Sequence, residues 1–217
     1  MLSKYTHVAY LGQPIKEEIC WISNTGAKML PNEEKLDPRV KRTRSLILGA
    51  FNDLLTEKSF DSISVQDMTD KAQINRATFY AHFEDKYALL DHWVQQQFRQ
   101  EIETRVLDAC HYTSENLRML ILTVCEFLAK VRSDCVQSQR QFEPMIEKQV
   151  KNQVYELLNL WLGKMNTSVS TEIPATVATW AIYGLASHWS HSRKRLPLEK
   201  FVDEALPLVA VNLEQFA

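Results

Sequence analysis

The chain has 217 residues, 45% of them apolar and 24% charged, and a formal net charge of −2. Such fractions are typical of a folded globular protein and exclude a chain that is disordered throughout. Because no apolar run approaches the roughly 18 residues of a membrane-spanning helix, and the N-terminus lacks a secretory-signal pattern, we expect a cytoplasmic protein with no membrane partner.

Residues that interrupt helices are scarce, with five Gly and seven Pro in the whole chain, which favours long helices over strands. Residues 1–36 contain Pro14 and Pro31 and show no sustained hydrophobic period, so we interpret them as an accessory or poorly ordered extension. The cysteines lack CxxC spacing and are expected to be reduced and mostly buried, with no metal or cofactor; they are Cys20, Cys110, Cys125 and Cys135.

The first predicted helix begins at Asp37-Pro38, because Asp is a good N-cap and proline is tolerated at the first helical position. It ends near Lys58-Ser59. Its apolar residues recur at helical spacing and form one stripe, consisting of Ile47, Ala50, Phe51, Leu54 and Leu55. We therefore expect one face of this helix in a core.

Two shorter helices are predicted next. Ser64 and Asp67 have the spacing of a capping box, which indicates a helix from there to residues 72–73. Asn75 is a good N-cap for a third helix over about residues 76–82. Two short helices joined by a three-residue turn have the geometry of a helix-turn-helix, whose second helix lies in the DNA major groove.

The rest of the chain also predicts helices. A fourth opens at Glu84-Asp85 and directs Tyr87, Leu89, Leu90 and Trp93 inward. Two later stripes consist of Leu117, Leu120, Ile121, Val124, Leu128 and Val131, and of Ile146, Val150, Val154, Leu157, Leu158 and Trp161. After a polar connector at 166–171, one helix runs from Pro174 to about Ser190, and a last helix follows the basic loop at 193–195. Pro207 should kink that last helix or shift its start. The predicted fold class is all-α.

The second short helix of the helix-turn-helix has an apolar and a polar face. Phe79 and Phe83 share one face and should enter the core. The side chains left toward solvent or a DNA groove are Arg76, Ala77, Thr78, Tyr80 and Ala81. Arginine suits a bidentate contact with guanine, and the hydroxyls of threonine and tyrosine suit phosphate oxygens. A basic cluster ahead of the first apolar stripe is placed to reach backbone phosphates; it consists of Arg39, Lys41, Arg42 and Arg44.

The same segment reads Thr78-Phe79-Tyr80-Ala81-His82-Phe83, followed by Asp85-Lys86 and Ala88-Leu89-Leu90, and it resembles the signature of the TetR family of bacterial transcriptional regulators. The likeness covers roughly residues 38–93, whereas residues 94–217 are similar only in helical layout. It implies a helix-turn-helix DNA-binding domain at 37–99 and a C-terminal helical bundle at 100–217 for dimerisation and ligand binding. The implied function is sequence-specific binding of a DNA operator by a homodimeric repressor that responds to a small-molecule effector of unknown identity.

The resemblance also implies which residues lie at or near DNA: Ser64, Val65, Gln66, Arg76, Ala77, Thr78, Tyr80, His82 and Lys86. It implies that Lys86 holds a phosphate. One departure is Gln73, at a turn position where the family commonly has Gly. Glycine is favoured there because a left-handed backbone costs another residue about 1 kcal/mol or more.

The charge of the predicted DNA-binding domain is evidence against DNA binding. Residues 37–93 contain eight Lys or Arg against nine Asp or Glu, so the segment is −1 and DNA binding must depend on where the basic side chains lie. Together with Gln73, this keeps open the alternative of an adaptor or ligand-sensing protein that has the fold without DNA binding. An enzyme is not expected, because the chain has no HExxH, no GxSxG and no Gly-rich phosphate loop.

The last two predicted helices indicate a homodimer. Gly184, with Ala178 and Ala181, permits close helix approach, and the final helix is apolar around more than one face. Trp180, Tyr183 and Trp189 fit either a dimer interface or the lining of a ligand cavity. His188 and His191 share a helical face, but no third metal ligand has a convincing spacing, so no metal is expected.

Overall fold

The computed structural model describes residues 37–106, 111–134, 139–165 and 170–214. Within these ranges the regular elements are all helices, as the sequence predicts. They are α1 (Pro38–Glu57), the 3-10 helix η2 (Phe60–Ser62), α2 (Val65–Ala72), α3 (Arg76–Tyr80), α4 (Lys86–Arg105), α5 (Ser114–Asp134), α6 (Gln139–Lys164), α7 (Glu172–His191) and α8 (Leu198–Glu214). The predicted N-terminal extension at 1–36 lies outside the described residues, as do Cys20, Cys110 and Cys135.

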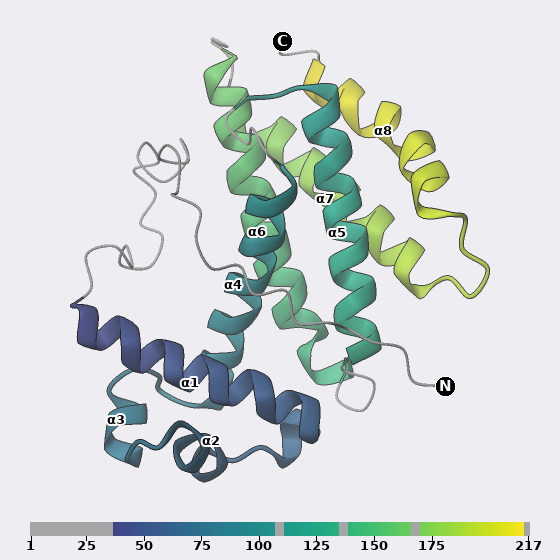
Figure 1. Ribbon diagram of the computed structural model, residues 1–217. Coiled ribbons are helices and arrows are strands. Elements are labelled where there is room, and N and C mark those ends of the chain that lie inside the picture. Colours follow the sequence, from purple (N-terminus) through teal and green to yellow (C-terminus); the bar gives the residue numbers. More distant parts are fainter. Residues whose placement is uncertain (1–36, 107–110, 135–138, 166–169, 215–217) are drawn as a thin grey trace.

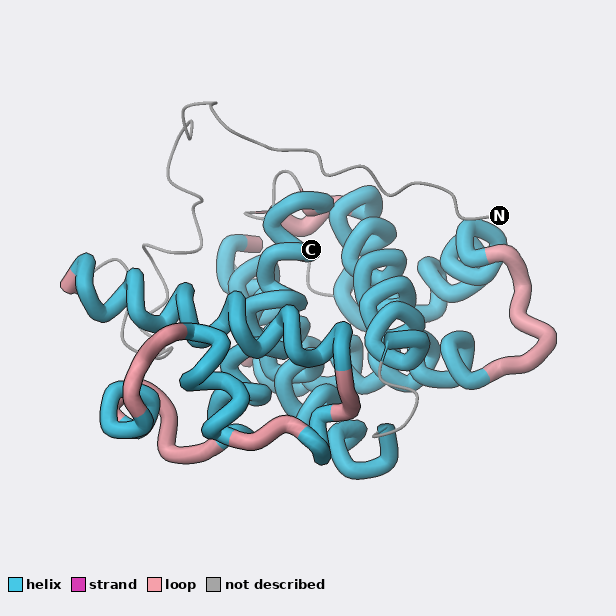
Figure 2. The backbone as a smooth tube through the Cα atoms, turned by 60° about the horizontal axis from the view of Figure 1, so that its bottom comes forward, coloured by secondary structure: helices cyan, strands magenta, loops and turns pink. Residues whose placement is uncertain are grey.

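The helices form two groups that α4 connects (Figure 1). Helices α1, α2 and α3 gather at one end of the molecule, where α1 packs on α2 and α2 on α3. From this end α4 runs into a bundle, where it packs against α5 and α6. Helix α7 packs against α5, α6 and α8, and α8 also packs on α5. Figure 2 brings the end formed by α1 to α3 toward the viewer.

Local signals in the sequence explain where the first helix begins. The Asp37 carboxylate accepts a hydrogen bond from the Arg39 N–H at 2.7 Å, and Pro38 occupies the first helical position. This is the predicted N-cap, which satisfies a backbone donor that the helix itself leaves unpaired. Helix α1 then buries the predicted stripe, with Leu55 only partly buried at its edge.

Helix α4 begins at Lys86, directly after the predicted start at Glu84-Asp85. The Asp85 carboxylate accepts from the N–H groups of Tyr87 and Ala88, both at 2.8 Å, and thereby caps the helix. Leu89 and Leu90 are buried as predicted. Tyr87 is instead 40% exposed, and its ring packs edge-to-face on the outer side of the buried Phe60 ring. Since α4 is continuous across residue 99, the division between the two predicted domains stays a prediction.

The two long apolar stripes predicted for the bundle are confirmed, and every residue in them is buried. Cys125 is buried in α5 beside this stripe, and burial raises the pKa of its thiol to about 12, so it is an inert core residue. Two prolines lie inside helices: Pro144 in α6 and Pro207 in α8. The α8 helix continues through Pro207 and starts at Leu198, so its start is not shifted. Among the described helices, none has the length and hydropathy of a membrane span.

Candidate nucleic-acid interface

The polar side of α3 is open to solvent. Phe79 and Phe83 are buried at 0% and 6% exposure, which anchors the helix on the core formed with α1 and α4. On the opposite side, Arg76, Ala77 and Tyr80 are exposed, and Tyr80 is 48% exposed. The Tyr80 ring makes an edge-to-face contact with Phe79, with ring centroids 5.5 Å apart, and nearly half of its side chain remains open to a partner.

Local hydrogen bonds fix the start of α3. The Asn75 side-chain oxygen accepts from the Thr78 N–H at 2.7 Å and from the Thr78 hydroxyl at 2.9 Å, as expected for an N-cap. The Thr78 hydroxyl can still accept a bond through its oxygen, but its proton is directed to Asn75. The guanidinium of Arg76 is 3.5 Å from the Tyr80 hydroxyl, which is a long contact that leaves its other donors to solvent. Helix α3 ends at Tyr80, two residues before the predicted end.

The turn between α2 and α3 has the left-handed backbone expected at this position. Gln73 adopts φ 54° and ψ 44°, and it is the only non-glycine residue with positive φ in the described part of the chain. Its N–H and that of Ile74 bond to the carbonyls of Asp70 and Thr69, which closes the end of α2. The turn therefore keeps its shape although a glutamine occupies it.

The N-terminus of α2 carries the predicted capping box. The Asp67 N–H donates to the Ser64 hydroxyl at 3.1 Å, and the Ser64 N–H donates to the Asp67 carboxylate at 2.7 Å. These bonds, with the Lys58 ammonium at 2.9 Å, hold the pKa of the Asp67 carboxyl well below its usual range, the Ser64 hydroxyl being the largest cause. Gln66 is exposed and bonds to Asp70 at 2.6 Å, whereas Val65 is half-buried against the core.

The basic end of α1 reaches the end of α3. Arg42 is exposed, and the Arg44 guanidinium lies 5.6 Å from the centre of the Phe83 ring. His82 is half-buried beside it, and burial, followed by the positive charge of Arg44, lowers the pKa of its imidazole. His82 is thus favoured as a neutral ring. The structure brings Arg44, His82 and α3 together at one edge of the helix-turn-helix.

Lys86 has an internal role that the sequence did not reveal. Its ammonium donates to the carbonyls of Ile63 at 3.0 Å and of Phe60 and Asp61 at 3.2 Å each. It also lies 4.6 Å from the centre of the Phe60 ring. The three donors of an ammonium group are therefore directed at protein oxygens, and Lys86 ties the start of α4 to the segment before α2. Its predicted contact with a phosphate stays a prediction.

The three aromatic residues of α7 do not share one role. Trp180 is 57% exposed, with the Lys151 ammonium 3.5 Å from its ring centre. Trp189 is buried, and its indole N–H donates to the Leu196 carbonyl at 2.9 Å, which fastens the loop before α8. Tyr183 lines a pocket, where burial and then Glu147 and Glu143 raise its pKa to about 12.

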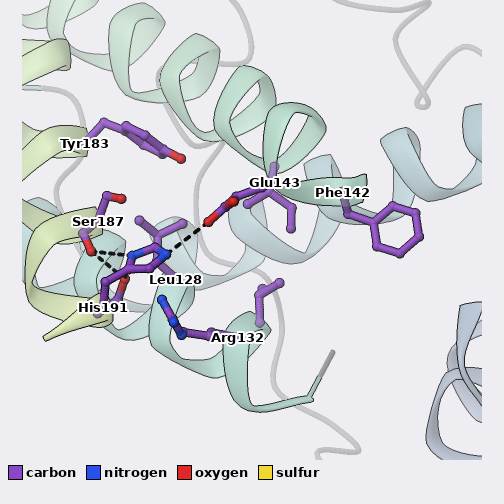
Figure 3. A pocket seen from close by; sticks show the side chains of 10 residues that line it. Leu128, Arg132, Phe142, Glu143, Tyr183, Ser187 and His191 are labelled. Atoms are coloured by element: carbon purple, nitrogen blue, oxygen red, sulfur yellow. Dashed lines mark hydrogen bonds and ion pairs between the residues drawn. The ribbon is translucent and has the colours of Figure 1, made fainter. Parts of the chain in front are cut away.

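The pocket that Tyr183 lines is bounded by α5, α6 and α7. Its empty volume is about 490 Å³, including space open to solvent. Its apolar lining comprises Leu128, Val131, Phe142 and Ile146, and its polar lining comprises Arg132, Glu143, Tyr183, Ser187, Ser190 and His191. Sequence periodicity marks Leu128, Val131 and Ile146 as core. It carries no signal for the pocket, because the polar set comes from three separate helices (Figure 3).

No group of three or more possible metal ligands occurs among the described residues. His191 is engaged otherwise: its Nε2 lies 3.0 Å from the Glu143 carboxylate and its Nδ1 lies 2.7 Å from the Ser187 carbonyl. His188, its neighbour on the helical face, is exposed.

The described residues form a helical fold whose helix-turn-helix end presents a short, exposed polar helix. The sequence model described as "Bacterial regulatory proteins, tetR family" matches residues 47–92, which span α2, α3 and most of the described interface. Over these residues the chain is therefore similar to the TetR family of bacterial regulatory proteins.

Curated relatives match over part of the chain. The uncharacterized HTH-type transcriptional regulator YxbF of Bacillus subtilis is 40% identical over 72 residues, which are 33% of this chain and 19% of that protein. The HTH-type dhaKLM operon transcriptional activator DhaS of Lactococcus lactis is 31% identical over 80 residues, 37% of this chain and 41% of that protein. In these two comparisons the chain therefore covers less than half of the relative.

Solved structures extend the likeness in fold to both groups of helices. The dihydroxyacetone kinase operon activator DhaS superposes with a TM-score of 0.53 at 20% identity, covering 80% of this chain and 97% of that one. A TetR-family regulator of Streptomyces coelicolor gives a TM-score of 0.55 at 16% identity, covering 82% and 98%. The shared architecture is a helix-turn-helix domain followed by a helical bundle.

Proposed function

We propose that this protein is a sequence-specific, DNA-binding transcriptional regulator that acts as a homodimer, represses its target and responds to a small-molecule effector. The observation that carries the proposal is the capped α3 helix, with Phe79 in the core and Arg76 and Tyr80 open to solvent. A rigid short helix with exposed hydrogen-bonding groups fits the major groove, where base edges present a distinct pattern for each base pair.

Each candidate residue then takes a role from its position. Arg76, at the first turn of α3, reads a base edge, and Ala77 allows close approach to the groove floor. The Tyr80 hydroxyl donates to a phosphate oxygen, and the Thr78 hydroxyl does so when its proton turns from Asn75 toward the DNA. Ser64, Val65 and Gln66 lie at the start of α2, where backbone N–H groups and the helix dipole favour a phosphate.

Basic side chains flank this surface and supply the electrostatic part of binding. Arg42 and Arg44 come from α1, and Arg44 lies close to His82 and the end of α3. Lys86 adds positive charge at the start of α4. Three acidic residues of residues 37–93 already have partners within the protein: Asp37 and Asp85 cap helices, and Asp67 pairs with Lys58. The overall charge of −1 therefore does not prevent a local basic surface.

The homodimer is proposed from an apolar outer face on α7 and α8. Ile173, Val177 and Trp180 are spaced as one stripe of α7 and are exposed by 73%, 43% and 57%. Leu208 and Val211 form a similar stripe on α8, the helix that packs beside α7. Exposed apolar stripes on two neighbouring helices favour burial against a partner, and a second copy supplies the same stripes to make a four-helix contact.

The residues first expected to make this contact are placed differently. Ala178 is fully buried and Ala181 is partly buried against the core, so neither faces outward. Gly184 is exposed, and a Cβ added there would meet no atom within 4 Å. Gly184 therefore continues the stripe of Val177 and Trp180, and the dimer is proposed to form through this outer face.

We propose that the protein represses transcription by occupying its operator. Binding of the effector then changes the separation of the two α3 helices in the dimer. Two-fold readers of DNA need recognition helices about 34–36 Å apart, so a modest change weakens binding. The relative DhaS is named an activator, and a reporter assay distinguishes the two directions: deletion of this protein should raise expression from its operator.

Selection of duplexes from a random pool tests the proposal. We expect enrichment of an inverted repeat, because a two-fold dimer reads two equivalent half-sites. The variant Arg76→Ala should fail to enrich the same sequence, whereas the exposed control Lys200→Ala on α8 should enrich it fully. A pool that stays random with the wild-type protein would support the adaptor reading and overturn the proposed function.

A further inference from the structure

His82 lies in the turn between α3 and α4, at the edge of the candidate interface. Its backbone N–H donates to the Phe79 carbonyl at 2.9 Å, which fixes the residue directly after α3. The imidazole is half-buried, and within the described part of the chain no hydrogen bond engages either of its ring nitrogens. The ring nitrogens of His82 are therefore available to a ligand that approaches this edge.

Arg44 brings an unpaired positive charge from α1 to the same edge. Its guanidinium lies 5.6 Å from the centre of the Phe83 ring, the residue that follows His82. The Nε atom of Arg44 is buried without a hydrogen-bond partner, and the side chain forms no ion pair with a carboxylate of the described residues. Because a partly buried charge without a counter-charge is costly, this edge favours an anion.

The other charged or titratable groups around His82 do not offset the charge of Arg44. Glu84 is exposed to solvent, and Asp85 caps α4. The His92 ring of α4 packs on the phenylalanine that follows His82, with ring centroids 5.7 Å apart. Burial, and then the charge of Arg44, lowers the pKa of the His82 imidazole below its ordinary value of 6.5. The ring is therefore mostly neutral at pH 7 in the free protein.

A DNA phosphate at this edge reverses the balance between the neutral and the charged ring. A phosphate offsets the Arg44 charge that opposes protonation of His82. An opposite charge within about 4–6 Å also favours the charged form of a titratable group by about tenfold or more. The imidazolium has two N–H donors where the neutral ring has one, so it gains a hydrogen bond as well as an ion pair.

We propose that His82 binds a DNA phosphate as an imidazolium, so that each protomer takes up a proton from solvent when its helix-turn-helix binds DNA. The affinity for DNA then increases as the pH falls, until the pH reaches the range in which the free ring is also protonated. The inference rests on the proposed function, which supplies the phosphate, and adds to it a regulation of DNA binding by pH.

Titration calorimetry of the intact wild-type protein with a selected duplex counts the protons directly. The heats of binding at pH 7 are compared in phosphate and in Tris, two buffers of different ionisation enthalpy, at the same ionic strength. We expect uptake of between about half a proton and one proton per protomer. An uptake of zero would overturn the proposal, because a neutral ring that only donates its N–H group takes up no proton.

The variant His82→Gln tests whether this residue takes up the proton. Glutamine keeps an N–H donor but cannot become charged. From pH 8 to pH 6 at constant ionic strength, the affinity of the wild type for the duplex should rise about tenfold or more, and that of His82→Gln less than about threefold. His111→Gln, at an exposed histidine before α5, is the matched control and should show the rise of the wild type.

A full rise in His82→Gln would assign the proton to another group and overturn the proposal. Circular dichroism checks that the variant is folded, and the calorimetry on the wild type does not depend on any variant. Wild-type protein that binds no selected duplex contradicts the proposed function and this inference with it. Wild-type protein that binds the duplex without proton uptake contradicts only this inference.

Discussion

The ammonium nitrogen of Lys86 lies 3.0 Å from the carbonyl oxygen of Ile63, across 23 positions of the sequence. Two further carbonyls, those of Phe60 and Asp61, accept from the same group at 3.2 Å. The Phe60 carbonyl also accepts from the Ile63 N–H at 3.0 Å, so Lys86 adds side-chain bonds to a segment that already has a backbone turn of its own. Lys86, which was expected only to contact DNA, therefore also stabilises the helix-turn-helix domain.

Lys86→Met should lower the free energy of unfolding by about 1–3 kcal/mol, the usual range for lost hydrogen bonds to a charged group. Methionine keeps an unbranched side chain of similar length and removes the ammonium group. Urea unfolding of the variant measures the effect, and Lys200→Met on the exposed surface of α8 is the matched control. An unchanged unfolding midpoint for Lys86→Met would show that these bonds do not stabilise the fold.

Arg76 and Lys86 should affect DNA binding in different ways. Arg76→Ala should lose about 1–3 kcal/mol on a selected site and little on random duplex, because a base contact carries the specificity. Lys86→Met should weaken both duplexes similarly and flatten the salt dependence by about one contact. Fluorescence anisotropy on both duplexes measures these losses. Equal losses by both variants on both duplexes would contradict the assigned roles.

Gln73→Gly should raise the free energy of unfolding by up to about 1 kcal/mol, because a left-handed backbone is strained for a residue with a Cβ. The matched control is Gln100→Gly in the middle of α4, where the same replacement should destabilise by about 0.5–1 kcal/mol. Thermal unfolding of the two variants gives opposite shifts. If Gln73→Gly lowered the free energy of unfolding, the glutamine side chain would have to stabilise the fold by more than the strain of its left-handed backbone costs.

The Ser64–Asp67 capping box should make stability depend on acid. The pKa of Asp67 is below its ordinary value of 3.8, with the Ser64 hydroxyl as the first cause, so the folded state favours the carboxylate. The stabilisation is fully present above that ordinary value and is lost as the pH falls through the lowered one. The melting temperature of the wild type should therefore exceed that of Asp67→Asn at pH 6, and the difference between the two melting temperatures should decrease below pH 4. A difference in melting temperature that stays constant down to pH 2 would show that the Asp67 carboxylate does not supply this stabilisation.

Val177→Glu should convert the proposed dimer to a monomer, because the outer face of α7 would bury a charge without a partner. Leu46→Glu is the matched control, since Leu46 on α1 is 46% exposed and Val177 is 43% exposed. Light scattering at micromolar concentration measures both. A dimeric Val177→Glu would place the interface elsewhere, and a monomeric wild type would contradict the homodimer.

The sequence predicted those features of the fold that depend on near neighbours in the chain. The caps at Asp37, Ser64 and Asn75 are confirmed because each bond joins residues two or three positions apart. The buried stripes are confirmed because helical periodicity reports burial directly.

Features that depend on distant partners were not predictable. The contacts of Lys86 with Phe60 and of Phe142 with Phe60 join residues far apart in the chain, and no local pattern marks them. The orientation of α7 was misjudged for the same reason: a helix with apolar residues on most sides does not indicate which face packs inward. Ala178 is buried and Trp180 is exposed, although α7 packs against α5, α6 and α8.

The most direct test of the account is the affinity of the wild-type protein for a selected duplex and a scrambled one across a salt series, measured by fluorescence anisotropy. The account predicts binding of the selected duplex at least about a thousandfold tighter than the scrambled one. It also predicts a logarithm of affinity that falls linearly with the logarithm of salt concentration, as phosphate contacts require. Equal affinity for both duplexes, or binding that is insensitive to salt, would contradict the claim that α3 reads DNA sequence.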